Sequence, residues 1–233
     1  MVENDFFLKA VNRMGRNKYS VEERDAILKT FLRYTREIME SEGAEAVSTR
    51  KLAALTGYNS AKLYTYFKNI DDLVAMASVS YMEKYCKALA ADVGKMLTAK
   101  DFLVHSWEVF CDCAFDEPAV YYRIFFGNQA TPLQELMDEY YRLFPSQLEK
   151  LDENTRAMLK NGNIYRRSMI TLEPLVEQGL LSSKRASVIN ELLVSYFKSM
   201  LETRMRGDGG YLHKKELCEK FMDALALLLE DLQ

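Results

Sequence analysis

The sequence predicts an all-α protein, and three observations lead to this prediction. Apolar residues recur at steps of three and four over long stretches, as they do on the buried face of a helix. No sustained alternation of β-branched and polar residues, bounded by turn pairs, indicates a strand. The 233 residues include only 4 prolines and 10 glycines, so long helices can run without interruption.

The first expected helix covers residues 21–42, where one apolar stripe is followed by Gly43 as a left-handed stop. Ser48 is a good N-cap for a short helix at 49–56, which ends at Gly57. The stripe of the first helix consists of Ile27, Phe31, Tyr34 and Ile38.

Asn59 can cap a second short helix at 60–67, and Asn69 with Asp72 resembles a capping box that opens a long helix at 70–91. Prolines in first turns indicate further helix starts near Pro118 and Pro132. The remaining helices are expected at 154–178, with an irregularity at Gly162, at 184–206 and at 211–231.

The bulk composition is that of a globular protein, with 48% hydrophobic and 28% charged residues. No run approaches the roughly 18 apolar residues that a membrane span needs, and the N-terminus lacks the features of a signal peptide. We therefore expect a cytoplasmic protein. Its four cysteines are expected to be free, buried thiols rather than metal ligands with His105, because their spacing is not that of a zinc site.

Charge is distributed unevenly along the chain. Residues 1–70 contain 12 basic and 9 acidic residues, whereas the rest of the chain contains 19 basic and 25 acidic residues. A basic end on an acidic body is typical of a protein whose end meets a polyanion, although differences of this size are also common between the halves of unrelated proteins.

A helix of about twenty residues followed by two short helices across a glycine turn is the arrangement of a helix-turn-helix unit. Its second short helix is the one that enters a major groove. Leu63 and Phe67 are expected to face the core above Leu52 and Leu55. At the start of that helix, the side chains able to reach base edges or phosphates are Tyr58, Asn59, Ser60 and Lys62, and the small Ser60 and Ala61 permit a close approach.

Other polar residues of the same unit suit phosphate contacts, which fix register without reading sequence. Tyr64, Thr65 and Lys68 lie off the apolar stripe, and Thr49 and Arg50 open the preceding helix after its cap, where backbone amides assist. Three packed short helices with aromatic residues also occur in proteins that never touch DNA, so the pattern alone leaves both interpretations open.

Residues 22–75 resemble the DNA-binding domain of the TetR family of bacterial transcriptional regulators (TetR/AcrR-like). The family's pattern runs Gly–apolar–Ser–small–small–x–Leu–Tyr–x–Tyr/His–Phe, then a polar pair and an acidic helix start; this chain reads GYNSAKLYTYF at 57–67, then KN and, at 71–73, DDL. Residues 47–53, VSTRKLA, also fit the family. Tyr58 departs from the usual small aliphatic residue and Asn59 from the usual Ser or Thr, so no operator sequence carries over.

The resemblance implies that Tyr64 and Lys68 contact phosphates, that Thr49 and Lys62 lie at the DNA surface, and that Tyr66 is either packed or on the DNA backbone. The full predicted DNA-binding set is Ser48, Thr49, Arg50, Tyr58, Asn59, Ser60, Ala61, Lys62, Tyr64, Thr65, Tyr66 and Lys68. The resemblance also implies three segments: a basic N-terminal extension at 1–20, a helix-turn-helix DNA-binding domain at 21–75, and a helical ligand-binding and dimerisation domain at 76–233.

The extension is either an arm that adds phosphate or minor-groove contacts, or a terminus that packs locally through residues 6–8. The basic residues of this segment are Lys9, Arg13, Arg16 and Lys18.

Residues 92–233 contain no recognisable catalytic motif, so we expect neither an enzyme nor a cofactor. Their many aromatic and Met residues form either a plain core or a cavity for a mainly apolar ligand. The resemblance favours the cavity, because most such regulators respond to a small molecule. The candidate pocket residues are His105, Trp107, Phe110, Tyr122, Arg123, Phe126, Tyr141, Tyr165 and Met169, with Asn128 and Arg166 as further polar candidates.

The last two helices carry apolar stripes, and the tail LALLLEDL is too apolar to lie exposed on a monomer. Burial within the same chain is one explanation. The resemblance implies another, a four-helix interface of a homodimer whose two-fold symmetry fits a palindromic operator. The candidate interface residues are Val188, Leu192, Tyr196, Met200, Phe221, Leu225 and Leu228.

These expectations combine into a dimeric DNA-binding transcriptional regulator, most simply a repressor released by a small, mainly apolar effector. Two alternatives remain at this point. One is a ligand-independent architectural or division-type DNA-binding protein of the same fold. The other is an all-helical small-molecule-binding protein that does not bind DNA.

Overall fold

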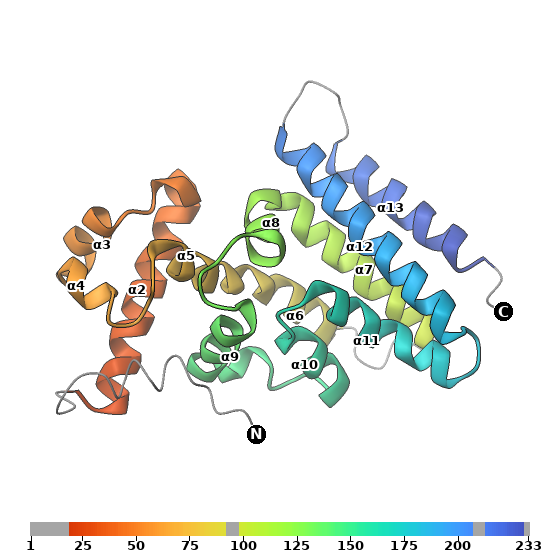
Figure 1. Ribbon diagram of the computed structural model, residues 1–233, viewed down its shortest axis with the longest axis horizontal. Helices are drawn as coiled ribbons and strands as arrows, with labels where there is room; N and C mark the ends of the chain where they lie inside the picture. The colour runs from red at the N-terminus through yellow and green to blue at the C-terminus, as the bar shows by residue number, and fades with distance from the viewer. Residues whose placement is uncertain (1–18, 92–97, 207–212, 231–233) are drawn as a thin grey trace. The chain divides into compact units, whose positions relative to one another are not determined.

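The computed structural model describes residues 19–91, 98–206 and 213–230, and within these ranges it contains helices and no strand (Figure 1). The predicted all-α fold is confirmed. The four basic residues of the N-terminal extension, Lys9 to Lys18, lie outside the described residues. In the described ranges, no helix combines the length and the apolar character that crossing a membrane requires.

The chain forms two compact units, and the first of them is not continuous in sequence. It comprises Met1–Ser80 together with Asn128–Phe144, while the second comprises Tyr81–Gly127 and Pro145–Gln233. The sequence-based division placed all residues after 75 in one C-terminal domain. The structure instead groups residues 128–144 with the N-terminal helices, for reasons that lie in two side-chain clusters described below.

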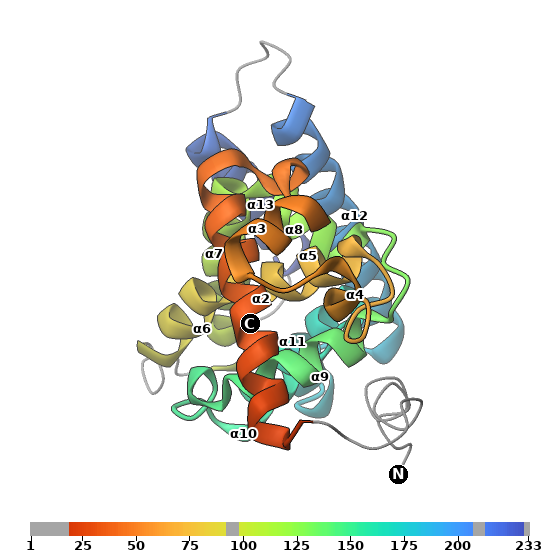
Figure 2. The ribbon, with the colours of Figure 1, turned by 90° about the vertical axis from the view of Figure 1, so that its left-hand side faces the viewer.

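The first unit is built around α2 (Val21–Glu42), which contacts η1 (Ala44–Ala46), α3 (Thr49–Thr56) and α5 (Ile70–Ser78). In the chain, α4 (Ser60–Leu63) comes between α3 and α5, and α9 (Leu133–Leu143) packs against α5. Figure 2 shows this unit with α2 toward the viewer. A capping box at Ser20 and Glu23 opens α2, and Gly43, with a φ of 89°, ends it.

The second short helix is shorter than predicted. It ends at Leu63, and residues 64–66 form a turn in which the amides of Tyr66 and Phe67 donate to the carbonyl of Leu63 at 3.0 and 3.1 Å. After this turn, Asn69 has extended backbone and caps α5 through the amide of Asp72. Leu63 and Phe67 are buried as predicted. The prediction for Leu55 was wrong, since its side chain is 45% exposed on a helix that fully buries only Leu52.

Asp72 holds the segment before α9 against the first unit. Its carboxylate is fully buried and accepts hydrogen bonds from the amides of Ala130 and Thr131 at 3.0 Å each and from the Thr131 hydroxyl at 2.6 Å. The ammonium of Lys68 donates to the carbonyl of Ala130 at 3.3 Å. A buried carboxylate is costly unless hydrogen bonds replace its water, so these three donors explain why Asp72 and residues 130–131 stay together.

A second cluster ties α9 to α2. The Arg142 guanidinium donates to both carboxylate oxygens of Asp25, at 2.6 and 2.9 Å, and also binds the buried Glu139 one turn earlier. The Arg142 hydrogen bonds lower the pKa of Asp25 below its ordinary value. Bidentate pairing of this kind fixes orientation as well as contact.

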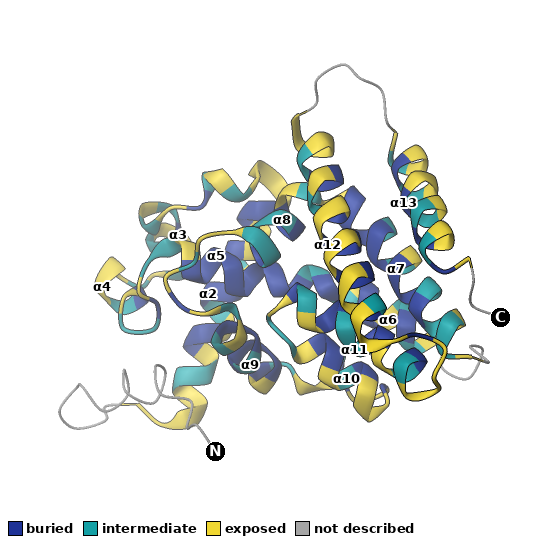
Figure 3. Ribbon diagram, turned by 45° about the vertical axis from the view of Figure 1, so that its right-hand side comes forward, coloured by how far each residue is buried: buried dark blue, intermediate teal, exposed yellow. Residues whose placement is uncertain are grey.

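The second unit consists of seven α-helices in its described residues. They are α6 (Met82–Ala91), α7 (Ala99–Asp116), α8 (Pro118–Phe126), α10 (Glu153–Lys160), α11 (Ile164–Glu177), α12 (Ser183–Arg206) and α13 (Lys214–Leu228). α7 contacts α6, α11 and α13, and α12 contacts α8, α11 and α13, so that buried residues line the facing sides of these helices (Figure 3). The 3₁₀ turns η2 (Val79–Tyr81) and η3 (Pro145–Gln147) lie where the chain passes between the units.

Aromatic side chains form the centre of the second unit. The ring centroid of Trp107 lies 4.9 Å from that of Phe221 and 5.7 Å from that of Phe197, and Phe110 lies 5.0 Å from Phe197. Tilted and edge-to-face pairs at these distances stabilise a core beyond simple area burial. Part of the aromatic surplus is therefore plain core.

Two predicted helices are interrupted. The helix expected at 70–91 is divided by η2 into α5 and α6, and the unit boundary falls at this point. The helix expected at 154–178 is broken around Gly162 into α10 and α11, as the glycine indicated, and Gly179 ends it with a φ of 72°.

We predict that Asp72→Ala lowers the free energy of unfolding by about 3 kcal/mol, because it leaves the buried donors of Ala130 and Thr131 without their charged acceptor. Urea unfolding followed by circular dichroism measures the change. Asp71→Ala is the matched control: it removes a carboxylate from the same helix turn but from an exposed position, and its expected cost is about 0.5 kcal/mol. Equal losses for the two variants would contradict the assigned role of Asp72.

Candidate nucleic-acid interface and ligand cavity

The turn between α3 and α4 is positioned by short-range caps. The Ser48 hydroxyl accepts from the amide of Lys51 at 3.3 Å and opens α3, and Gly57 ends α3 with a φ of 73°. The Asn59 side-chain oxygen accepts from the amide of Lys62 at 2.9 Å and opens α4. Both predicted caps are confirmed. The Asn59 oxygen is therefore engaged in the cap, and its amide nitrogen is the donor that this exposed side chain offers to a partner.

Tyr58 contributes to packing. Its ring is half-buried and lies 5.6 Å, centroid to centroid, from the ring of Phe31 on α2. The sequence placed Tyr58 at the tip that meets bases. The contact with Phe31 explains why an aromatic residue suits this position, since the ring extends the core between α2 and the turn.

The start of α4 presents small, exposed side chains. Asn59, Ser60 and Ala61 are exposed, Tyr64 is 52% exposed, and Arg50 and Lys68 are exposed nearby. The remaining members of the predicted set are less accessible: Thr49, Lys62, Thr65 and Tyr66 are half-buried, and burial raises the pKa of Tyr66. Ser48 is exposed at the start of α3. The exposed members suit a close approach to an extended anionic backbone.

Aromatic rings hold the ammonium of Lys62. Its nitrogen lies 3.5 Å from the ring centroid of Tyr19 and 5.6 Å from that of Tyr66. The Thr65 hydroxyl donates to the carbonyl of Lys62 at 2.7 Å and is thereby engaged within the turn. Lys62 thus carries a positive charge at this surface in a fixed place, through cation–π contacts.

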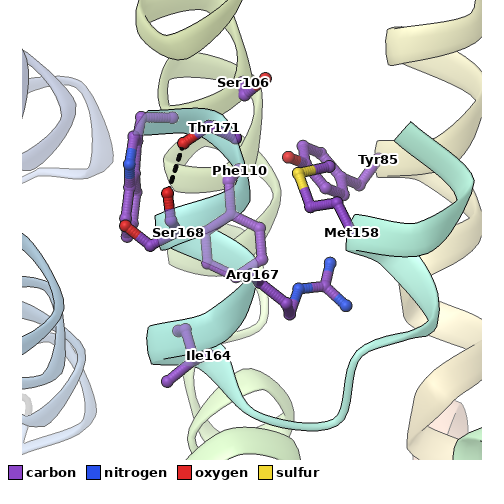
Figure 4. A pocket seen from close by; sticks show the side chains of 9 residues that line it. Tyr85, Ser106, Phe110, Met158, Ile164, Arg167, Ser168 and Thr171 are labelled. Atoms are coloured by element: carbon purple, nitrogen blue, oxygen red, sulfur yellow. Dashed lines mark hydrogen bonds between the residues drawn. The ribbon is translucent and has the colours of Figure 1, made fainter. Parts of the chain in front are cut away.

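The second unit contains a small cavity of about 30 Å³ between four helices (Figure 4). Its walls come from α6, α7, α10 and α11, through Tyr85, Ser106, Trp107, Phe110, Met158, Ile164, Arg167, Ser168 and Thr171. The guanidinium of Arg167 extends from α11 toward the side on which Tyr85 and Met158 lie. Such a volume accommodates about two water molecules.

Two of the nine predicted pocket residues, Trp107 and Phe110, line this cavity. Tyr141 and the further candidate Asn128 belong to the first unit, and Arg166 is exposed. The other predicted residues are half-buried in the second unit and do not line the cavity, namely His105, Tyr122, Arg123, Phe126, Tyr165 and Met169.

The polar residues of the cavity were not among the predicted pocket residues, although the spacing of those on α11 indicates that they are buried. Buried positions on α11 follow the order 164, 167, 168, 171, 172 and 175, which is the stripe of one helix face. Ile164, Leu172 and Leu175 define this stripe by their apolar side chains. Arg167 lies on it, whereas its neighbour Arg166 does not.

The predicted dimer residues divide into an exposed and a buried group. On α12, Val188, Leu192 and Tyr196 are 52%, 50% and 38% exposed and lie four residues apart, on one side of the helix. Figure 3 shows exposed positions along α12. Met200, Phe221 and Leu225 are buried within the second unit, and Leu228 is half-buried. On α13 the strongly exposed apolar residue is Leu227, at 69%.

Comparison with known proteins supports the resemblance. Residues 31–77 match the family model of bacterial regulatory proteins of the tetR family, which confirms the resemblance over part of α2, through α3 and α4, and into α5. The fold resembles that of FadR from Thermus thermophilus, a TetR-family transcriptional repressor solved in complex with lauroyl-CoA. The match covers 88% of this chain and 95% of that chain, with 16% sequence identity and a TM-score of 0.57. At this identity, the likeness shows a shared fold.

A weaker likeness is to PfmR, a TetR-family transcriptional regulator that also comes from Thermus thermophilus, with 18% identity, 87% of this chain and 98% of that chain covered, and a TM-score of 0.44. No curated protein matches the chain.

Proposed function

We propose, from the tetR-family helix-turn-helix in residues 31–77, that this chain is a dimeric transcriptional regulator that binds a palindromic operator and is released from it by a small effector. The observation that carries the proposal is the family match over a turn whose small and basic residues are exposed, Ser60, Ala61 and Lys68 among them. This reading makes the protein a cytoplasmic repressor rather than an enzyme.

Dimerisation is supported by the exposed stripe of α12. Three large apolar side chains that lie four residues apart, each 38% or more exposed, are costly to leave in water and suit a self-complementary helix interface. In the dimer, the two copies of α4 enter successive major grooves about 34–36 Å apart.

Effector control is supported by the shared fold and by the chain path. FadR, which shares the fold, was solved with lauroyl-CoA. The cavity here is about 30 Å³, whereas drug-sized ligands occupy roughly 300 Å³ or more. An effector must therefore enlarge the cavity by moving α10 or α11 away from α7. That movement supplies the second conformation that coupling between an effector site and a DNA-binding site requires.

The chain also offers a covalent route between the units. α8 belongs to the second unit, and the residues directly after it are held by Asp72 and Lys68 in the first. A displacement of α8 would pull on the residues that precede α9, next to Lys68 at the proposed DNA surface.

The small cavity also favours a second candidate function, a ligand-independent DNA-binding protein of the same fold, because such a protein needs no enlargeable pocket. Sequence-selective DNA binding that no small molecule changes would favour this candidate.

The proposal is tested by fluorescence anisotropy of the purified protein with DNA from upstream of its own gene, over a salt series. We expect selective binding of one dimer per site, with an affinity that falls steeply with salt as phosphate-bound counterions are released. The control is DNA of the same length and shuffled sequence. Failure to bind this DNA, together with failure of selection from random sequences, would contradict the proposed function.

We predict different effects for phosphate-contacting and base-contacting residues. Tyr64→Ala and Lys68→Ala should weaken binding to operator and shuffled DNA by the same factor, and Lys68→Ala should reduce the salt slope by about 1. Asn59→Ser keeps an oxygen that can cap α4 but removes the amide nitrogen, so it should change the preference between sequences while helix content is retained; Lys62→Ala should also change preference. Four variants that lower affinity alike would show the assignment of base-contacting residues to be wrong.

We predict that Leu192→Arg raises the dimer dissociation constant by about a hundredfold, because it places a charge at the centre of the exposed stripe of α12. Size-exclusion chromatography with light scattering over a concentration series measures this change. Leu180→Arg is the matched control, since Leu180 is also exposed, at 40%, but lies outside the stripe. Loss of the dimer in both variants, or in neither, would count against this interface.

A further inference from the structure

Within the described part of the chain, Arg167 is a buried cation without an anionic partner. Its residue exposure is 4%, and its Nη1 donates to the carbonyl of Leu159 at 2.8 Å. Its Nη2 is buried and has no hydrogen-bond partner, and among the described residues no carboxylate forms an ion pair with it. A guanidinium carries five N–H donors and stays charged at every accessible pH, so neutralisation cannot relieve the cost of burial here.

Neighbouring groups compensate only part of that charge. The guanidinium lies 5.1 Å from the ring centroid of Phe125 and 6.0 Å from that of Phe110, distances at which cation–π attraction acts. Burial raises the pKa of Tyr85 and that of Tyr121, so both phenols stay neutral and offer no counter-charge. Buried ions in proteins are normally paired, which makes the unpaired Nη2 an observation that needs an explanation.

A second buried polar group lines the same cavity. The Ser168 hydroxyl is buried, lines the same cavity and also lacks a hydrogen-bond partner among the residues that the structure describes. The rest of the wall is largely apolar, with Trp107, Phe110, Met158 and Ile164. The hydroxyl of Ser106, another lining residue, is also buried without a hydrogen-bond partner in the described part of the chain. The cavity thus combines one positive charge and several hydroxyl groups with apolar and partly adaptable side chains (Figure 4).

We propose that this cavity binds a monoanionic effector, an apolar molecule that carries a carboxylate, with the carboxylate on Arg167 Nη2. The inference deepens the proposed function and rests on it for the effector role, although the binding itself does not depend on DNA. A carboxylate suits the site better than a phosphate, because Arg167 supplies one positive charge and a phosphate dianion would leave a negative charge uncompensated against the apolar wall.

The chain contains its own probe for this site. Trp107 is the single tryptophan of the sequence and lines the cavity, so its fluorescence reports occupancy directly. The full-length protein, without DNA, is titrated with acetate, hexanoate and dodecanoate, and in parallel with the alcohols and amines of the same chain lengths. We expect at least one carboxylate to change Trp107 fluorescence and to bind about tenfold or more tightly than its matched alcohol, and the amines to bind most weakly.

Variants test whether Arg167 causes the preference for carboxylate over alcohol. Arg167→Met keeps much of the side-chain length without the charge and should abolish the preference for carboxylate over alcohol, while the melting temperature of the free protein stays the same or rises. Arg166→Met, on the exposed neighbour, should leave both quantities unchanged. If Arg167→Met fails to fold, Arg167→Lys serves instead, with weaker carboxylate binding but retained discrimination against amines.

Equal binding of carboxylates and alcohols, absence of any carboxylate response, or a preference that survives Arg167→Met would overturn the proposal and leave the cavity as a site for ordered water. Failure of this inference is distinguishable from failure of the proposed function. DNA binding without carboxylate binding would remove the inference alone, whereas carboxylate binding without any effect on DNA affinity would confirm the site and remove its effector role.

Discussion

The buried carboxylate of Asp72 is the interaction on which the arrangement of the first unit depends. It lies in the first turn of α5, where the helix dipole favours a negative charge, and it accepts three hydrogen bonds from residues 130 and 131. Those donors would otherwise be unsatisfied. Because of this contact, α9 packs with the helix-turn-helix, and Lys68, at the proposed DNA surface, is held to the same segment. The bidentate pair of Arg142 with Asp25 then fixes the far end of α9 on α2.

Local features of the fold could be predicted from the sequence because their causes are local. Ser48, Asn59 and Asn69 cap helices through amides three residues away, and Gly43 and Gly57 end helices with positive φ. The partner of Asp72 lies 59 residues away, so no spacing rule reveals it, and the placement of residues 128–144 in the first unit could not be foreseen. The end of α4 at Leu63 was also not foreseen, although the cap at Asn69 that follows it was.

The candidate ligand site was predictable only in part. The surplus of aromatic residues indicates either core or cavity, and the structure shows that Trp107 serves both purposes, since it packs on Phe221 and lines the cavity. Residue type alone does not distinguish Arg167 from the other polar residues of the second unit, whereas its helix face does. Its position on the stripe of Ile164 and Leu172 is a periodicity argument that needs only the sequence, whereas its lack of a carboxylate partner among the described residues depends on how four helices meet.

Because the first unit is discontinuous in sequence, it also limits which fragments of the protein can contain the complete unit. A fragment that ends near Ser80 contains every residue of the helix-turn-helix, yet it lacks α9 and the donors that satisfy Asp72. Such a fragment would expose the face of α5 that α9 covers and would carry an acidic side chain on that otherwise apolar face. A minimal DNA-binding domain of this protein therefore has to be assembled from two separate stretches of chain, with residues 128–144 joined to the end of α5 by a designed linker or supplied as a peptide.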